Sequence, residues 1–323
     1  MKKFNKFLYV LNNDSQEPSP SLLRTIGLAK NNQVDLTLLL VLPKLSIPYS
    51  LKTEELNTVE IEQAILTQQE QKLRQLVTSL DAGINIEVQL KVGKRYLESV
   101  RLVLAERCDM LIKEVDKLSW LDHLIGSDDM HLLRNCPCPV WLMKKDEKPN
   151  YKNILAAVDF DSESDKTCND ELNYLIMSLC SSIALAEFSR IHVATVYNAA
   201  HAGFVSLWAD NPEKIEKEML ESEFRNSRYK MDLLFDNVKQ EIGIESFNFL
   251  SLHLHIVKGT AGEELPKIAK NIDADLVVMG TVARTGIAGL VIGNTAETIL
   301  NQLNSSVLAI KPKGFTSPIK SMT

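Results

Sequence analysis

Short apolar runs alternate with stretches of helical spacing along this chain. In its second half, continuous apolar runs predict strands at 154–158, 191–197, 249–257, 275–279 and 306–310. Between them, apolar residues that recur every three or four positions predict helices marked by Leu172 to Ile183, Met231 to Ile242, Leu265 to Ile272 and Ala296 to Leu303. Because the strands are apolar on both faces and alternate with helices, the pattern predicts a parallel sheet covered by helices on both sides.

The pattern occurs twice. The segment FLYVLNNDS at 7–15 matches ILAAVDFDS at 154–162, an interval of 147 residues, and MLIKEVDK from 110 matches VVMGTVAR from 277, an interval of 167. The halves meet at DEKPNY, 146–151, where charge and proline indicate a linker. We therefore expect two tandem α/β domains, 1–148 and 149–323. Each is expected to be doubly wound, with a five-stranded parallel sheet in the order 3-2-1-4-5 and helices on both faces.

Composition and charge narrow the classes of partner. The 323 residues are 45% hydrophobic and 24% charged, with a net charge of −6, which argues against nucleic acid or an anionic membrane surface as the partner. No apolar run reaches the ~18 residues that a membrane-spanning helix needs. The five cysteines lie in apolar or helical contexts, which favours reduced thiols. The expected location is the cytoplasm.

A glycine-rich loop, GTVARTGIAGLVIGNTAE at 280–297, follows the fourth strand of the second half. Gly280 permits a sharp turn, and Asn294 is the predicted N-cap of the next helix, with Glu297 completing a capping box. A helix start attracts anions, and Arg284 and Thr295 could add donors. In a sheet of order 3-2-1-4-5, the ligand crevice lies between strands 1 and 4, which brings Asp159 near this loop. The alternative is that the glycines only connect a strand to a helix.

The loop resembles the signature of the universal stress protein family: glycine, two residues, glycine, nine residues, glycine, then serine or threonine. The two copies resemble its tandem members, and GTVARTGI followed by GNTAE resembles the E subgroup. The resemblance implies a non-enzymatic stress-response protein that binds ATP, AMP or another nucleotide-linked ligand. Carried over by position, and with Arg284 added from the helix-start argument, the expected ligand-binding residues are Asp159, Met279, Gly280, Val282, Ala283, Arg284, Gly293, Asn294 and Thr295.

Two positions of this loop depart from the family signature. Ala283 replaces a glycine and Asn294 replaces the hydroxyl residue, which weakens the inference of ATP while leaving a ligand in the same crevice. The first half departs further. On the 167-residue interval, Lys113 stands where the leading glycine would be, and Asn12 replaces the strand-end aspartate. The first domain is therefore expected to be a structural partner without a nucleotide site.

Other interpretations remain beside this one. The chain could be an interaction scaffold without a ligand, in which the two domains pair or a homodimer forms, or a weak ATPase. His253 and His255 alternate on a predicted strand and could form a metal pair, but no third ligand is evident nearby, so ordinary packing is favoured and no metal is expected. The stretch from Asp159 partly imitates a phosphatase nucleophile motif, but its fifth position is Glu163 instead of threonine or valine.

Overall fold

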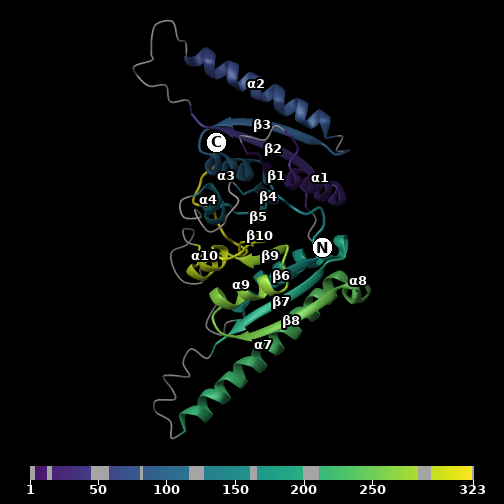
Figure 1. Cartoon of the computed structure of the whole chain (residues 1–323), viewed down its shortest axis with the longest axis vertical. Coiled ribbons are helices and arrows are strands. Elements are labelled where there is room, and N and C mark those ends of the chain that lie inside the picture. The colour runs from purple at the N-terminus through teal and green to yellow at the C-terminus, as the bar shows by residue number, and fades with distance from the viewer. Residues whose placement is uncertain are drawn as a thin grey trace. The chain divides into compact units, whose positions relative to one another are not determined.

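The structure is a computed structural model that describes residues 4–12, 17–44, 58–80, 83–115, 127–160, 166–198, 211–282 and 292–321. It divides into two compact units, which we call the N-terminal and C-terminal units. Figure 1 labels their elements. Those of the N-terminal unit are β1 (Lys6–Val10), α1 (Pro20–Asn32), β2 (Asp35–Leu42), α2 (Thr58–Ser79), β3 (Ile86–Val92), α3 (Arg95–Glu106), β4 (Met110–Glu114), α4 (Asp128–Asn135) and β5 (Val140–Met143).

The C-terminal unit repeats this alternation with longer helices. Its elements are β6 (Asn153–Ala157), α5 (Lys166–Glu187), β7 (Arg190–Tyr197), α7 (Pro212–Ile242), α8 (Ile244–Phe249), β8 (Ser251–Lys258), α9 (Ala261–Asn271), β9 (Leu276–Gly280), α10 (Asn294–Leu300) and β10 (Ser306–Ile310). The five strands lie within two residues of the ranges that the apolar runs predict. Continuous apolar sequence located them because β6, β9 and β10 are covered on both faces.

The strand order confirms the predicted topology in each unit. The N-terminal sheet runs β3-β2-β1-β4-β5 and the C-terminal sheet runs β8-β7-β6-β9-β10, and the pairs within each are parallel. Each is the order 3-2-1-4-5 in its own unit. The central strands β1 and β6 therefore lie where the order of connection reverses, and the carboxyl ends of β1 with β4, and of β6 with β9, are adjacent.

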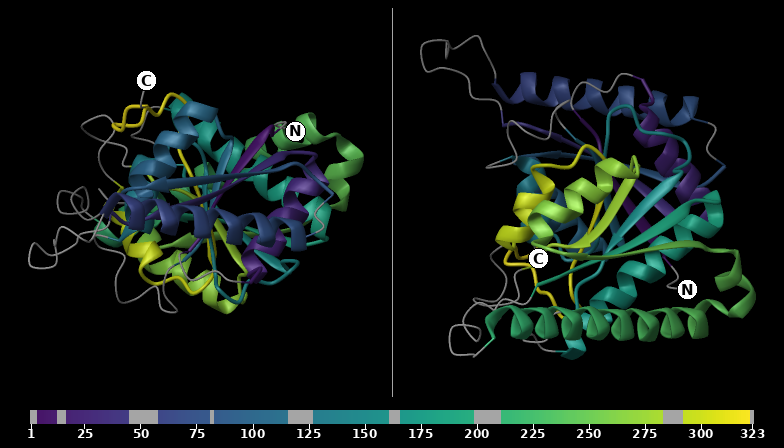
Figure 2. Two further views of the ribbon diagram at one scale, coloured as in Figure 1. Left: turned by 90° about the horizontal axis from the view of Figure 1, so that it is seen from above. Right: turned by 60° about the horizontal axis from the view of Figure 1, so that its bottom comes forward.

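Helices cover both faces of the C-terminal sheet. Helix α5 contacts β6, β7 and β9 and packs against α7, whereas α9 packs against β7 and α10. Figure 2 shows α7 on one side of the sheet and α9 on the other. With 31 residues, α7 is about 46 Å long, whereas the eight-residue strand β7 is about 27 Å long. The first turns of α7 consequently extend beyond the carboxyl end of the strand (Figure 1).

Two aspartates at equivalent positions show that the predicted interval between the two halves is one residue too long at β4 and β9. The carboxylate of Asp109 accepts hydrogen bonds from the backbone N–H groups that begin β1, at 2.6 and 3.2 Å. Asp275 does the same at the start of β6, at 2.6 and 3.0 Å. These residues are 166 positions apart, and the strand registers Phe7↔Met110 and Ile154↔Leu276 give the same interval at β4 and β9. The interval of 167 is therefore wrong here, although it holds at β5 and β10.

The one-residue correction changes which residues correspond. Lys113 is the structural counterpart of Met279, and Glu114 is the counterpart of Gly280. Successive residues of a strand point to opposite faces of the sheet, so the interval of 167 had paired side chains that lie on opposite faces. The prediction that Lys113 replaces the leading glycine is therefore wrong, and Glu114 replaces it.

Candidate functional site

The carboxyl ends of β6 and β9 form the candidate site, which we call the β6–β9 edge. Ala157 of β6 is in register with Met279 of β9, so the residues that follow both strands are neighbours. These are Asp159 on one side and the segment from Gly280 to Val282 on the other. The structure thus brings the two parts of the predicted site together at the reversal of strand order.

Asp159 is held in place by hydrogen bonds to its backbone, and its side chain is exposed. The side-chain amide of Asn173, a residue of α5 that is 2% exposed, makes two hydrogen bonds to it. Asn173 Oδ1 accepts from the N–H of Asp159 at 3.0 Å, and its Nδ2 donates to the carbonyl oxygen of Asp159 at 2.7 Å. Lys230 of α7 donates to the next carbonyl, that of Phe160, at 2.7 Å. Two helices therefore fix the chain where it leaves β6.

The glycine loop is closed at its base. Val282 and Ile292 form an isolated antiparallel bridge, and the N–H of Gly293 donates to the carbonyl of Thr281 at 3.2 Å. Helix α10 consequently begins directly beside the end of β9. The predicted residues Ala283 and Arg284 belong to the loop between these two points and lie outside the described residues.

The start of α10 differs from the prediction. Gly293 is the N-cap, its carbonyl accepts from the N–H of Glu297 at 3.0 Å, and no side chain caps the helix. The prediction that Asn294 is the N-cap is therefore wrong, because Asn294 already belongs to the first turn. Asn294 and Thr295 are exposed. The side chain of Met279 is 3% exposed, so its backbone alone is accessible for a ligand contact.

Gly280 has a reason to be glycine that sequence reasoning missed. A Cβ atom at this position would lie 2.8 Å from Cδ2 of Leu172 on α5, while the backbone has no left-handed conformation that would itself require glycine. The glycine thus allows α5 to pack closely against the end of β9. This packing also brings Asn173, the neighbour of Leu172, to the end of β6.

A buried lysine stands next to the loop base. Lys311, which follows β10, is 6% exposed, and its Nζ atom donates to Oγ1 of the fully buried Thr281 at 3.0 Å. The ammonium also lies 5.0 Å from the ring centroid of Phe315. No sequence motif marks this residue. Its only signal was a lysine directly after the last apolar strand. A positive charge at this place favours an anion at the neighbouring edge.

The same place in the N-terminal unit, the β1–β4 edge, is charged. At the corrected interval, five charged residues of the N-terminal unit correspond to five uncharged residues of the C-terminal unit. In order, Arg95, Lys113, Glu114, Asp128 and Asp129 correspond to Ala261, Met279, Gly280, Asn294 and Thr295. The strand registers align β4 with β9, and the first helical residues align α3 with α9 and α4 with α10 at the same interval of 166. The two edges share a backbone arrangement and differ in the chemistry that surrounds it.

Comparison with known proteins identifies the family. The model of the Universal stress protein family matches residues 3–144 and, a second time, residues 150–311. The chain belongs to this family. It is a tandem member, and its membership places it among stress-response proteins.

Relatives match both halves of the chain. Universal stress protein E of Photorhabdus laumondii is 28% identical and covers 99% of this chain, which in turn covers 99% of that relative. The protein of the same name from Escherichia coli K12 is 29% identical over 75% of this chain and 73% of its own length. A crystal structure of a Pseudomonas aeruginosa protein of unknown function is 28% identical, with a TM-score of 0.64, over 97% of this chain and 94% of its own. These similarities confirm the tandem fold and the resemblance to the E subgroup.

Three histidines gather on the C-terminal sheet of this universal stress protein. His253 and His255 share a face of β8, and His192 of β7 joins them, with its Nδ1 atom 3.0 Å from Nε2 of His255. The rings of His192 and His253 are stacked, with centroids 4.9 Å apart. Burial, followed by the charges of the other two histidines and of Arg190, lowers the pKa of His192 to about 4. Among the residues that the structure describes, no group of three or more metal-binding side chains is arranged to hold an ion.

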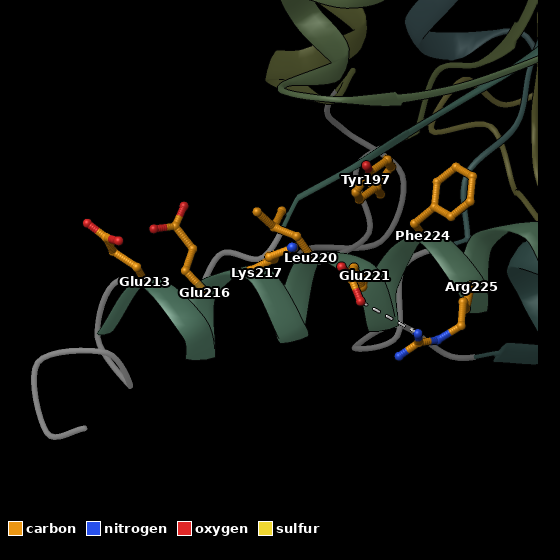
Figure 3. A pocket seen from close by; sticks show the side chains of 8 residues that line it. All are labelled: Tyr197, Glu213, Glu216, Lys217, Leu220, Glu221, Phe224 and Arg225. Carbon is orange, nitrogen blue, oxygen red and sulfur yellow. Dashed lines mark ion pairs between the residues drawn. The ribbon is translucent and has the colours of Figure 1, made fainter. Parts of the chain in front are cut away.

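A groove of about 520 Å³ runs along the first turns of α7. Figure 3 shows its lining: Tyr197 from the end of β7 faces Leu220 and Phe224 of the helix, and Glu221 pairs with Arg225 at 3.8 Å. No helix among the described residues is long and apolar enough to cross a membrane.

Proposed function

We propose that this protein is a non-enzymatic, cytoplasmic stress-response protein whose C-terminal unit binds a small phosphate-bearing ligand at the β6–β9 edge. The ligand is a nucleotide, such as ATP or AMP, or a nucleotide-linked metabolite. The observation that carries the proposal is the replacement of five charged residues of the β1–β4 edge by uncharged residues at the β6–β9 edge. At the end of β9 and in the first two residues of α10, uncharged side chains leave backbone N–H groups accessible to an anion, without a carboxylate on those residues to repel it.

Each proposed contact has a chemical role. The exposed carboxylate of Asp159 would accept hydrogen bonds from the sugar of a nucleoside. The backbone at Gly280, Val282 and Gly293 would approach the phosphate groups, with the side chains of Asn294 and Thr295 as donors. As the loop resemblance implies, we assign backbone contacts to Met279 and Ala283. The helix-start argument adds a charge-assisted contact from Arg284.

We further propose that the two units, apart from residues 317–321, correspond to domains at 1–148 and 149–323. The N-terminal domain acts as a partner without a nucleotide site, because the carboxylates of Asp128 and Asp129 already stand in the first turn of α4, where a phosphate group would bind.

Isothermal titration calorimetry of the full chain tests the ligand. ATP, AMP and a UDP-sugar should be titrated separately, and we expect heat of binding with one of them at a stoichiometry of about one per chain. The variant Thr295→Asp introduces the residue found at the equivalent position of the N-terminal unit and should abolish that heat. Asn211→Asp at the exposed N-cap of α7 is the matched control. It also adds one carboxylate at a helix start and should bind as the wild type does. No heat with any of the three compounds, in folded protein, would remove the nucleotide from the proposal.

A ligand-free scaffold is the second candidate, favoured by two exposed aromatic side chains. Phe188 and Phe249 are 95% and 83% exposed, and each stands two residues before the paired positions Arg190 and Ser251. Aromatic side chains are enriched at association surfaces relative to the rest of a protein surface. We propose that, if this candidate is correct, a second copy of the chain covers them. Analytical ultracentrifugation would then show a dimer that Phe188→Ser together with Phe249→Ser converts to a monomer. A wild-type monomer at micromolar concentrations would exclude it.

A further inference from the structure

The β1–β4 edge holds a buried ion pair. Nζ of Lys113 lies 2.9 Å from Oδ1 of Asp129, and the two side chains are 0% and 9% exposed. The same ammonium donates to the carbonyl of Glu114 at 2.9 Å. Lys113 belongs to β4 and Asp129 to the first turn of α4, so the pair connects the end of a central strand to the helix that follows it. Removing either partner would deprive the other, buried charge of this contact, which proteins tolerate poorly.

A second ion pair crosses the same edge. Nη1 of Arg95 donates to Oδ1 of Asn12 at 3.0 Å, and its Nε atom lies 3.4 Å from Oδ2 of Asp128. Asn12 follows β1 and Asp128 begins α4, so the guanidinium spans from the central strand to the helix start. Its side chain is 19% exposed and that of Asp128 is 30% exposed, so this pair is more accessible to solvent than the first.

The C-terminal unit has lost both members of both pairs. Met279 and Thr295 stand in place of Lys113 and Asp129, and Ala261 and Asn294 stand in place of Arg95 and Asp128. No charged member of either pair is retained without its partner. The comparison within one chain therefore indicates that the four charged side chains form one unit of structure, present at one edge and wholly replaced at the other.

We propose that these two ion pairs form a built-in plug at the β1–β4 edge. Lys113 and Arg95 supply the cations and Asp129 and Asp128 the anions, so the first turn of α4 is neutralised by the chain itself, at the place where the β6–β9 edge would receive a phosphate group. The N-terminal unit is then assembled without a ligand and admits none there. The statement that the β6–β9 edge receives a phosphate group rests on the proposed function, whereas the plug at the β1–β4 edge does not.

A double-mutant cycle at the buried pair tests the plug without any ligand. The variants Lys113→Met and Asp129→Thr introduce the residues of the C-terminal unit, separately and together. Each single variant should lower the unfolding temperature of the N-terminal unit by about 10 °C, because one charge is left buried. The double variant should recover more than half of that loss. Thermal unfolding of the full chain, with hydrogen exchange of β4 to identify the N-terminal transition, measures this. Single losses that simply add in the double variant would overturn the proposal.

Transfer of the plug to the C-terminal unit tests whether these ion pairs exclude a ligand. The variant with Met279→Lys, Thr295→Asp, Ala261→Arg and Asn294→Asp carries the plug at the β6–β9 edge. Calorimetry with ATP should show at least a tenfold loss of affinity, while the unfolding temperature stays within a few degrees of the wild type. Unchanged ATP affinity in the folded variant would overturn the proposal that the plug takes the place of the ligand. If the wild type itself binds no ATP, the proposed function fails at this ligand, and the double-mutant cycle still decides whether the plug exists.

Discussion

Acidification should destabilise the C-terminal unit through His192 and His255, whose pKa values are lowered in the folded protein. His192 carries the largest effect, since its pKa falls from 6.5 to about 4 in the folded protein. In the unfolded chain the side chain takes up a proton near pH 6.5, whereas in the folded chain it does not do so until near pH 4. Between these values the unfolded state binds more protons, so the free energy of unfolding decreases as the pH falls. Above pH 6.5 both states are neutral at this residue and it contributes no pH dependence.

The magnitude follows from the change in pKa and from exposure. A fully buried group with this change in pKa would lower the free energy of unfolding by about 3.4 kcal/mol on full acidification. His192 is half-buried, and solvent screening weakens such an effect, so we expect about 1–2 kcal/mol. For a unit of this size the loss corresponds to about 2–8 °C in unfolding temperature. The lowered pKa of His255 has the same sign and adds to the trend.

The assay compares wild type with His192→Gln in urea unfolding between pH 7.5 and pH 4.5. The variant should lose less stability on acidification than the wild type, because it lacks the titrating ring. His131→Gln is the control, since it also removes one histidine but from the ring stack with Tyr96 in the N-terminal unit. The His192 ring resonances should be followed by NMR in parallel. A midpoint near pH 6.5 in the folded protein, or parallel stability curves for wild type and His192→Gln, would refute the reasoning.

Three further substitutions probe the two ends of β6 and β9. Gly280→Ala should cost about 1–3 kcal/mol because its Cβ would meet Leu172 at 2.8 Å; thermal unfolding should show part of that loss recovered when Leu172→Ala is added, and no recovery would contradict the contact. Asp275→Ala should cost about 2–4 kcal/mol in urea unfolding, since two backbone N–H groups lose a charged acceptor, and a loss no greater than that of Asp275→Asn would argue against the charge. Asn173→Asp should cost about 1–3 kcal/mol, because the new carboxylate cannot donate to the carbonyl of Asp159; a calorimetric melt identical to wild type would contradict this.

The sequence predicted the sheet well because hydrophobic patterning determines it. Strands buried on both faces read as continuous apolar runs, and a parallel sheet with right-handed crossovers leaves few topologies for five such strands. The proximity of Asp159 to the glycine loop follows from that topology alone. Ranges and strand order could therefore be obtained without knowing any side-chain contact.

Side-chain contacts between different helices and strands could not be predicted from the sequence. The matching of Lys113 to Gly280 was wrong because a gapless alignment cannot register a single-residue shift between two copies, whereas the hydrogen bonds of Asp109 and Asp275 do. The third histidine was missed for a related reason. His192 lies opposite His253 only through the pairing of β7 with β8, and nothing in the local sequence indicates that register.

The order of strands also determines when each unit can fold during synthesis. In the N-terminal unit Phe7 pairs with Met110, and in the C-terminal unit Ile154 pairs with Leu276, so each central strand awaits a partner made about one hundred residues later. Until that partner leaves the ribosome, one edge of an apolar strand remains unpaired. These strand edges are open to wrong pairing with other nascent chains during that interval. We expect β1 and β6 to be the segments that most need a chaperone while the chain is being made.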